Sequence, residues 1–330
     1  MRIQEFTASP YGVDGPSEER WIEAIDLKTV QVAPDFAVGY VLMNKSRLGE
    51  APAIVAPGAF MSDLTTPSRA YEATQLAALG RPVLLLDLPG HGLSTPHTAA
   101  MTDDLCGARS ADSQAAPLLD AVQRLLPAQE PFDVAAVSHG ALMGLKIAEM
   151  HPDGLAGTVY GVELPAVKRR STLGLQVGYM VLDNMIGRKQ VLKELESRGL
   201  DADFNSFAAQ HDNLDVQRAA SFVRQNPGLF LRILITSINA RPVALDAWQK
   251  LMDTTDTHVE VATGSKTHVS DPEAIAAFID HLPVNQQLRS RQLIFAGEDH
   301  NAGIVHLMPR VVAGAQAAFA HTAAVRASQY

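Results

Sequence analysis

Residues 132–150 (FDVAAVSHGALMGLKIAEM) constrain the fold of this chain more than any other stretch. Their first half is a short apolar run rich in Val and Ala, which is typical of a buried strand. Their second half carries apolar residues at the spacing of one helix face: Leu142, Leu145 and Ile147. A strand therefore passes directly into a helix through residues 136–140 (AVSHG), and Ser138 lies at the turn. Small neighbours let the strand and the helix approach closely, while the serine is held on a strained backbone.

Three further segments accompany this turn. They are residues 51–60 (APAIVAPGAF), residues 82–94 (PVLLLDLPGHGLS) and residues 291–301 (RQLIFAGEDHN). Residues 51–60 resemble the oxyanion loop of the α/β-hydrolase family, and residues 82–94 resemble the loop after its fourth strand. The turn at residues 136–140 resembles its nucleophile elbow, and residues 291–301 resemble its histidine loop. The four segments occur in the order of the family. Two positions depart from the family pattern: Ala136 replaces the usual Gly, and Pro57-Gly58 replaces the usual His-Gly. The resemblance covers nearly the whole chain and implies an α/β protein with a mostly parallel, doubly wound sheet.

Alternating strands and helices are predicted along most of the chain. Apolar runs bounded by turn residues predict strands over residues 22–32, 36–43, 53–56, 83–86, 155–162, 259–262 and 292–296. Helical spacing predicts helices over residues 71–79, 103–126, 272–282 and 309–327. A turn at residues 33–35 joins the first two strands, which predicts an antiparallel start to the sheet. Where a helix links two strands, we expect a right-handed parallel crossover.

The alternation lapses between residues 165 and 251, where the pattern is helical. The α/β-hydrolase family carries a cap at this point. The resemblance therefore implies three parts: residues 1–163 and 252–330 as two pieces of the core, and residues 164–251 as a helical cap. Apolar residues of the cap would then line a substrate pocket. The alternative is a set of extra core helices packed on the sheet.

The resemblance also assigns the reacting groups. A serine hydroxyl is a weak nucleophile at neutral pH and needs a hydrogen-bonded base, so Ser138 requires an imidazole within reach. His300 follows the last predicted strand and is the candidate base. The backbone N–H of His139 corresponds to one oxyanion donor of the family, and the second donor would be the amide of Ala59 or Phe60.

The acid that orients the histidine is left open by the sequence. Residues 259–275 resemble the segment that delivers an aspartate in this family, but Thr267 stands at that position and cannot carry a negative charge. Glu163, just after a predicted strand, and Asp271, further along the later loop, are the two candidates. Each also has an ordinary structural interpretation. Glu163 would form a salt bridge at the base of the cap, and Asp271 would be the N-cap of the next helix.

Composition limits the partners and the compartment. The chain has 330 residues, of which 47% are hydrophobic, enough for one core and an insertion. Its formal net charge of −9, with no basic cluster, argues against nucleic acid or an anionic membrane surface as a partner. We find neither a signal peptide nor an apolar stretch that would span a bilayer, and the single Cys106 cannot form an internal disulfide. We therefore expect a cytoplasmic protein; its oligomeric state does not follow from the sequence.

The leading interpretation is a serine hydrolase that cleaves a carboxylic ester or thioester of a small apolar molecule through an acyl-enzyme on Ser138. An acyltransferase or a hydrolase of carbon–carbon bonds would use the same residues. A non-catalytic ligand-binding protein on a hydrolase scaffold is kept open by Thr267 and by the altered Pro57-Gly58 loop. The sequence contains no phosphate loop, dinucleotide fingerprint or H-E-x-x-H motif, so we expect no cofactor and no metal.

Overall fold

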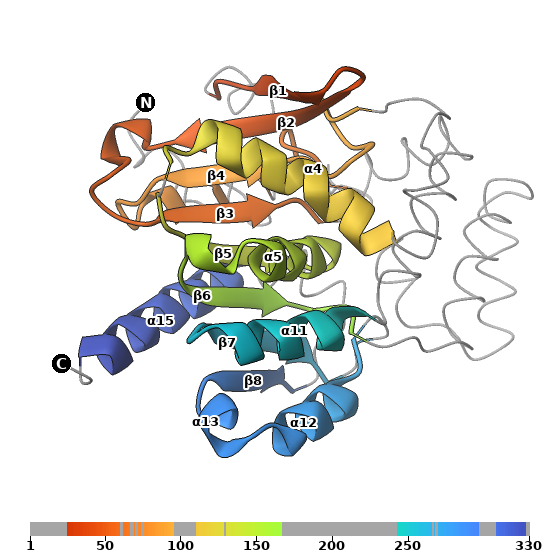
Figure 1. The fold of residues 1–330 in the computed structure, drawn as a ribbon, viewed down its shortest axis with the longest axis vertical. Coiled ribbons are helices and arrows are strands. Elements are labelled where there is room, and N and C mark those ends of the chain that lie inside the picture. Colours follow the sequence, from red (N-terminus) through yellow and green to blue (C-terminus); the bar gives the residue numbers. More distant parts are fainter. Residues whose placement is uncertain are drawn as a thin grey trace, which may run out of the picture.

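The computed structural model describes residues 25–59, 62–66, 69, 72–73, 76–95, 110–128, 130–166, 243–265, 267, 270–296 and 308–327. They form an eight-stranded sheet flanked by helices (Figure 1). The strands are β1 (Lys28–Ala33), β2 (Phe36–Met43), β3 (Ala53–Pro57), β4 (Val83–Leu86), β5 (Phe132–Val137), β6 (Leu155–Val162), β7 (His258–Gly264) and β8 (Ser290–Phe295). The helices are α4 (Ser110–Leu125), α5 (His139–Met150), α11 (Val243–Thr254), α12 (Pro272–His281), α13 (Val284–Gln287) and α15 (Met308–Ala327), with short 3-10 turns at η2 (Lys45–Arg47) and η3 (Pro152–Gly154). None of the helices described is long and apolar enough to cross a membrane.

The spatial order of the strands is β1-β2-β4-β3-β5-β6-β7-β8. β2 is antiparallel to both β1 and β4, and all the other neighbouring pairs are parallel. The strand order reverses around β3, so β3 and β5 lie side by side at the centre of the sheet (Figure 1). In open α/β sheets, the crevice at the carboxyl ends of the strands beside such a reversal is where ligands bind.

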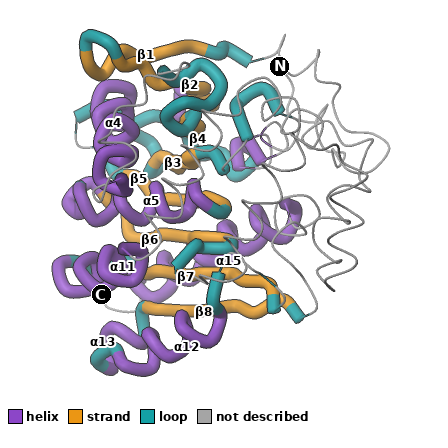
Figure 2. The backbone as a smooth tube through the Cα atoms, turned by 90° about the vertical axis from the view of Figure 1, so that its right-hand side faces the viewer, coloured by secondary structure: helices purple, strands orange, loops and turns teal. Residues whose placement is uncertain are grey.

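Successive residues of the central strands face two separate cores. Ala53 and Val55 of β3 belong to the core that α4, α5 and α11 cover, whereas Ile54 and Ala56 belong to the core that α15 covers. Figure 2 shows the first three helices on one side of the sheet and α15 on the other. Because both faces are covered, every residue of β3, β4 and β5 is buried. This explains why these strands are nearly continuous apolar runs in the sequence.

Most predicted elements of the sheet are present. The strands predicted over residues 36–43, 83–86 and 155–162 match β2, β4 and β6 to the residue. The first strand is shorter than predicted: β1 begins at Lys28, and the preceding Asp26 is exposed and forms an ion pair with Lys28.

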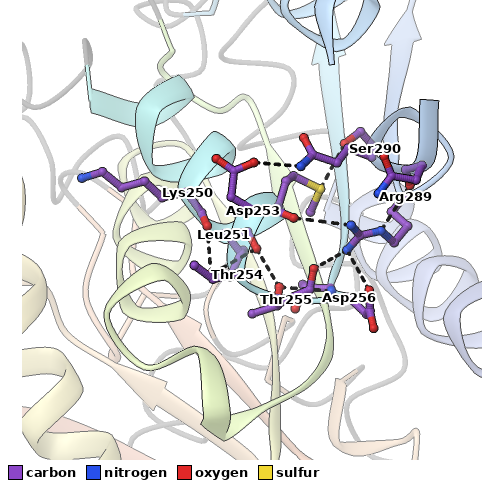
Figure 3. Close-up of polar contacts among 12 residues, drawn as sticks. Lys250, Leu251, Asp253, Thr254, Thr255, Asp256, Arg289 and Ser290 are labelled. Carbon is purple, nitrogen blue, oxygen red and sulfur yellow. Dashed lines mark hydrogen bonds and ion pairs between the residues drawn. The ribbon is translucent and has the colours of Figure 1, made fainter. Parts of the chain in front are cut away.

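α11 packs in the core layer, although it begins inside the segment 164–251 that the sequence assigns to a cap. Trp248 of α11 is fully buried, and α11 lies against α5. Figure 3 shows how its end is held: Arg289, which precedes β8, donates to the carbonyl of Thr255 just after the helix. Residues 167–242 lie outside the described residues.

Candidate active site

Ser138 lies at the junction between β5 and α5 on a strained backbone. Its φ is 55° and its ψ is −127°, a combination that residues with a side chain rarely adopt. Its N–H donates to the carbonyl of Val162 on β6 (2.7 Å), and its carbonyl accepts from the N–H of Ala141 in α5 (2.9 Å). The residue is only 5% exposed. These contacts hold the serine at the carboxyl edge of the sheet, at the start of a helix.

Glycines permit the close packing around this turn. A Cβ atom built on Gly140 would lie 2.5 Å from the backbone oxygens of both Pro57 and Gly58, which is too close for any side chain. On β6, a Cβ atom built on Gly161 would lie 3.2 Å from the Cβ of Ala141. The small residues in the sequence pattern therefore bring α5 against both β6 and the loop after β3.

At its carboxyl end, β3 keeps its pairing with β4 for two residues more than its pairing with β5. Along a strand, the backbone N–H groups point alternately toward the two neighbouring strands, so the nitrogen of Pro57 points toward β5, as that of Val55 does. Proline has no N–H, however, and cannot donate to β5. Pairing between β3 and β5 accordingly ends at Val55, whereas pairing with β4 continues to Pro57. The N–H of Gly58 then donates to the carbonyl of Leu86 on β4 (2.9 Å). β3 thus stays attached to β4 after its pairing with β5 has ended.

Two of the three predicted oxyanion residues are described. His139 is the first residue of α5, where backbone N–H groups have no partner within the helix. Its imidazole Nε2 lies 2.8 Å from Oε1 of Gln114 in α4, so the side chain is directed toward that helix. Ala59 is buried, and its carbonyl accepts from the N–H of Ser62 (3.1 Å), which bends the chain after β3. Phe60 lies outside the described residues.

Glu163 follows β6 directly and has the same unusual φ, 55°. It is fully buried. Its N–H donates to the carbonyl of Ala262 on β7 (2.7 Å), and its carboxylate Oε1 accepts from the N–H of Gly264 (2.5 Å). The residues that precede Ser138 and Glu163 are register partners on β5 and β6. The serine and a buried carboxylate therefore stand at the same edge of the sheet, on adjacent strands.

Asp271 and Thr267 lie in the loop between β7 and α12. Asp271 is the N-cap of α12, and its Oδ1 accepts from the N–H of Ala274 (3.1 Å). This matches the structural interpretation offered for it, with Pro272 in the first turn. Thr267, at the family's position for the acid, is buried, and its N–H donates to the carbonyl of Gly264 (3.4 Å).

The predicted base, His300, lies outside the described residues. β8 ends at Phe295, and the description stops at residue 296 and resumes at residue 308. The described part of the candidate site is therefore Ser138, His139 at the start of α5, the start of the loop after β3, and Glu163 after β6.

The loop after β4 contains two buried titratable groups. Asp87 accepts from the N–H of Leu64 at Oδ1 (2.8 Å) and from that of Leu93 at Oδ2 (3.1 Å), which joins two loops at the rim of the site. Burial, and secondly the charge of Asp63, raises the pKa of Asp87 to about 8. Burial also lowers the pKa of His91, whose Nδ1 lies 3.1 Å from the carbonyl oxygen of Pro89.

A buried ion pair near the site was not anticipated from the sequence. Arg69 donates through Nη1 to the carboxylate of Glu72 and through Nη2 to the carbonyl of Ala56 (2.7 Å). Burial raises the pKa of Glu72, although the charge of Arg69 opposes that shift. An Arg and a Glu three residues apart can signal a pair, but Arg69 lies outside the helix predicted over residues 71–79, and such spacing is far more common on exposed helix faces.

Solved structures similar to this chain share its architecture at low sequence identity. A structure from work on carboxylesterases of Nitrososphaera gargenis has a TM-score of 0.63 at 16% identity, covering 88% of this chain and 98% of the other. Potato (Solanum tuberosum) epoxide hydrolase I has a TM-score of 0.60 at 16% identity, covering 88% and 99%. The enol-lactonase of Burkholderia xenovorans LB400 has a TM-score of 0.59 at 14% identity, covering 88% and 98%.

Comparisons of the sequence itself give no relative. No protein-family model matches it. No curated protein matches it either. The assignment therefore depends on the strand order, on the strained serine between β5 and α5, and on the solved structures. The chain has the α/β-hydrolase fold.

Proposed function

We propose that this protein is a serine hydrolase that cleaves a carboxylic ester or thioester of a small apolar molecule. The observation that carries the proposal is that Ser138, on its strained turn, and the buried Glu163 follow adjacent strands at the same edge of the sheet. The solved structures with the same fold add support, because their names include carboxylesterases and an enol-lactonase.

The proposed reaction has two steps. In the first, His300 takes the proton of the Ser138 hydroxyl as the oxygen attacks the substrate carbonyl. The N–H of His139 and that of Ala59 or Phe60 donate hydrogen bonds to the carbonyl oxygen as it gains negative charge. The leaving alcohol or thiol then takes the proton from His300, and an acyl-enzyme remains. In the second step, His300 activates a water molecule, which releases the acid and restores the serine.

We infer that Glu163, rather than Asp271, is the acid that orients His300. Glu163 is fully buried and stands one strand from Ser138. Asp271 already uses its carboxylate to cap α12. The carboxylate of Glu163 also accepts an N–H from Gly264, which fixes its position at the carboxyl end of β6 and β7.

The substrate class follows from charge and composition. A net charge of −9 makes a polyanionic substrate unfavourable, whereas a small neutral apolar molecule meets no such barrier. Transfer of the acyl group to an alcohol, or cleavage of a carbon–carbon bond, would use the same residues. Product analysis with added alcohol therefore decides between hydrolysis and transfer.

Labelling with a fluorophosphonate tests the proposal directly. We expect a single covalent adduct by intact mass, mapped by peptide analysis to Ser138, and no adduct on the Ser138→Ala variant. Hydrolysis of 4-nitrophenyl esters should be lost in the same variant. A folded wild-type protein that neither reacts with the probe nor hydrolyses esters or thioesters would favour the ligand-binding alternative.

A further inference from the structure

We propose that Arg69 is a positioning residue for the loop that begins at Pro57 and carries Ala59. Its guanidinium holds the carbonyl of Ala56, the residue immediately before that loop, and so fixes where the loop's amides lie. The inference rests on the proposed function, because it gives Arg69 a task in stabilising the oxyanion.

The contacts of Arg69 close the loop at its base. The chain leaves the sheet at Pro57, passes through Ala59 and returns at Arg69, whose Nη2 donates to the carbonyl of Ala56 (2.7 Å). A second nitrogen of the same guanidinium donates to the carboxylate of Glu72. Because a guanidinium is planar and rigid, a carboxylate that fixes one nitrogen also fixes the direction of the other.

Stability alone does not account for this pair. The side chains of Arg69 and Glu72 are only 4% and 2% exposed. Moving each charge out of water costs several kcal/mol, and apolar residues of the same volume often give an equally stable protein. The raised pKa of Glu72 reflects the same cost of burial. A guanidinium that places one specific carbonyl gives a reason for a buried pair at this location.

The far side of the loop is held separately, by Asp87. Its Oδ1 accepts from the N–H of Leu64, in the stretch that leads from Ala59 toward Arg69. Loss of the Arg69 contact should therefore shift the loop without releasing it. A shift of about 1 Å in a catalytic group is enough to cost about 100-fold in rate.

The same strand supplies a matched control at its other end. Arg81 donates to the carbonyls of Pro52 (2.8 Å) and Ala53 (3.3 Å) at the start of β3, and it pairs with the buried Asp133 (2.6 Å). Removal of Arg81 therefore also deletes a charge pair and carbonyl contacts on β3, but at the amino end of the strand, away from Ser138.

The experiment compares Arg69→Met, Arg69→Lys and Arg81→Met with the wild type. For each, we would measure the maximal rate of fluorophosphonate labelling and the probe concentration that gives half of it, together with urea unfolding. For Arg69→Met we expect a maximal rate about 100-fold lower with little change in the half-saturating concentration. Arg69→Lys should recover part of the rate, because one ammonium can still donate to Ala56. Arg81→Met should lose stability but keep the wild-type rate.

The outcomes separate this inference from the proposed function. Absence of labelling in the folded wild type overturns both. A labelled wild type with an equal rate in Arg69→Met, or with equal losses in Arg69→Met and Arg81→Met, overturns only the role of Arg69. If Arg69→Met does not fold, the lysine variant decides: a wild-type rate there overturns the inference, and a reduced rate with unchanged half-saturation supports it.

Discussion

Ser138 and Glu163 share a backbone φ of 55° at the ends of adjacent parallel strands. Each also donates its N–H to the last part of the next strand, Ser138 to Val162 and Glu163 to Ala262, both at 2.7 Å. A non-glycine residue in such a conformation costs about 1–3 kcal/mol and persists where the surroundings enforce it. The two strained residues therefore indicate that the edge formed by β5, β6 and β7 is organised for chemistry.

Replacement of Glu163 by Gln should abolish most activity while the fold is retained. The glutamine oxygen can still accept the N–H of Gly264, but the charge that stabilises a forming imidazolium is lost. We expect kcat for ester hydrolysis to fall by about 10⁴-fold, as in other serine triads. Circular dichroism and urea unfolding would check the fold. A kcat within tenfold of the wild type would remove Glu163 from the mechanism.

Replacement of Asp271 by Ala should affect stability rather than activity. The change removes the side-chain acceptor for the N–H of Ala274 at the start of α12. Loss of an N-cap costs about 1 kcal/mol of unfolding free energy, which urea titration measures. Asp271→Ser keeps a capping oxygen and should recover most of that loss. A large fall in kcat in both variants would instead identify Asp271 as the acid.

The burial of Asp87 makes stability depend on pH. Its pKa is raised from 3.8 to about 8, so the folded protein holds the proton more tightly than the unfolded chain does. This contribution to stability is complete below pH 3.8 and is lost as pH rises toward about 8. Urea unfolding between pH 5 and pH 9 should therefore show a fall in stability for the wild type, and a smaller fall for Asp87→Asn.

Asp63 provides the control for that experiment. Its charge is the second cause of the raised pKa of Asp87, after burial. In Asp63→Asn, the pKa of Asp87 should be lower, so the loss of stability should end at a lower pH. A pH profile identical to the wild type in both variants would show that Asp87 does not control this dependence.

Replacement of Gly140 by Ala should damage both stability and activity. The new Cβ atom would lie 2.5 Å from the carbonyl oxygens of Pro57 and Gly58, and backbone atoms cannot move aside as a side chain can. We expect a loss of about 1–3 kcal/mol in unfolding free energy. Gly161→Ala, with a 3.2 Å approach to the Cβ of Ala141, should cost less. Equal losses in the two variants would contradict this account.

The sequence predicted the sheet well because its strands leave strong local signals. β4 and β6 match their predicted bounds to the residue: β4 is a fully buried apolar run, and the last six residues of β6 are buried. The sequence also predicted the turn at Ser138, because its pattern includes Gly140. A glycine is needed at that position, where α5 touches the backbone of the loop after β3.

Other features depend on contacts between distant residues, which periodicity does not report. α11 has the spacing of any amphipathic helix, and only its packing on α5 and its link to Arg289 show that it belongs to the core. The choice between Glu163 and Asp271 likewise depends on the element that each carboxylate contacts. Glu163 accepts a hydrogen bond from the end of β7, whereas Asp271 caps α12. The pairing of Arg69 with the carbonyl of Ala56 crosses from a helix to a strand and has no signature in the sequence.

Pro57 limits backbone pairing at the centre of the sheet, beside Ser138. Because it cannot donate to β5, the central ladder ends at Val55, and the protein forgoes a backbone hydrogen bond worth about 1 kcal/mol. A residue with an N–H at position 57 could extend that pairing toward the turn at Ser138. Selection for heat resistance alone would then favour variants at this position and change the backbone beside Ser138, so libraries built for thermal stability should hold Pro57 fixed.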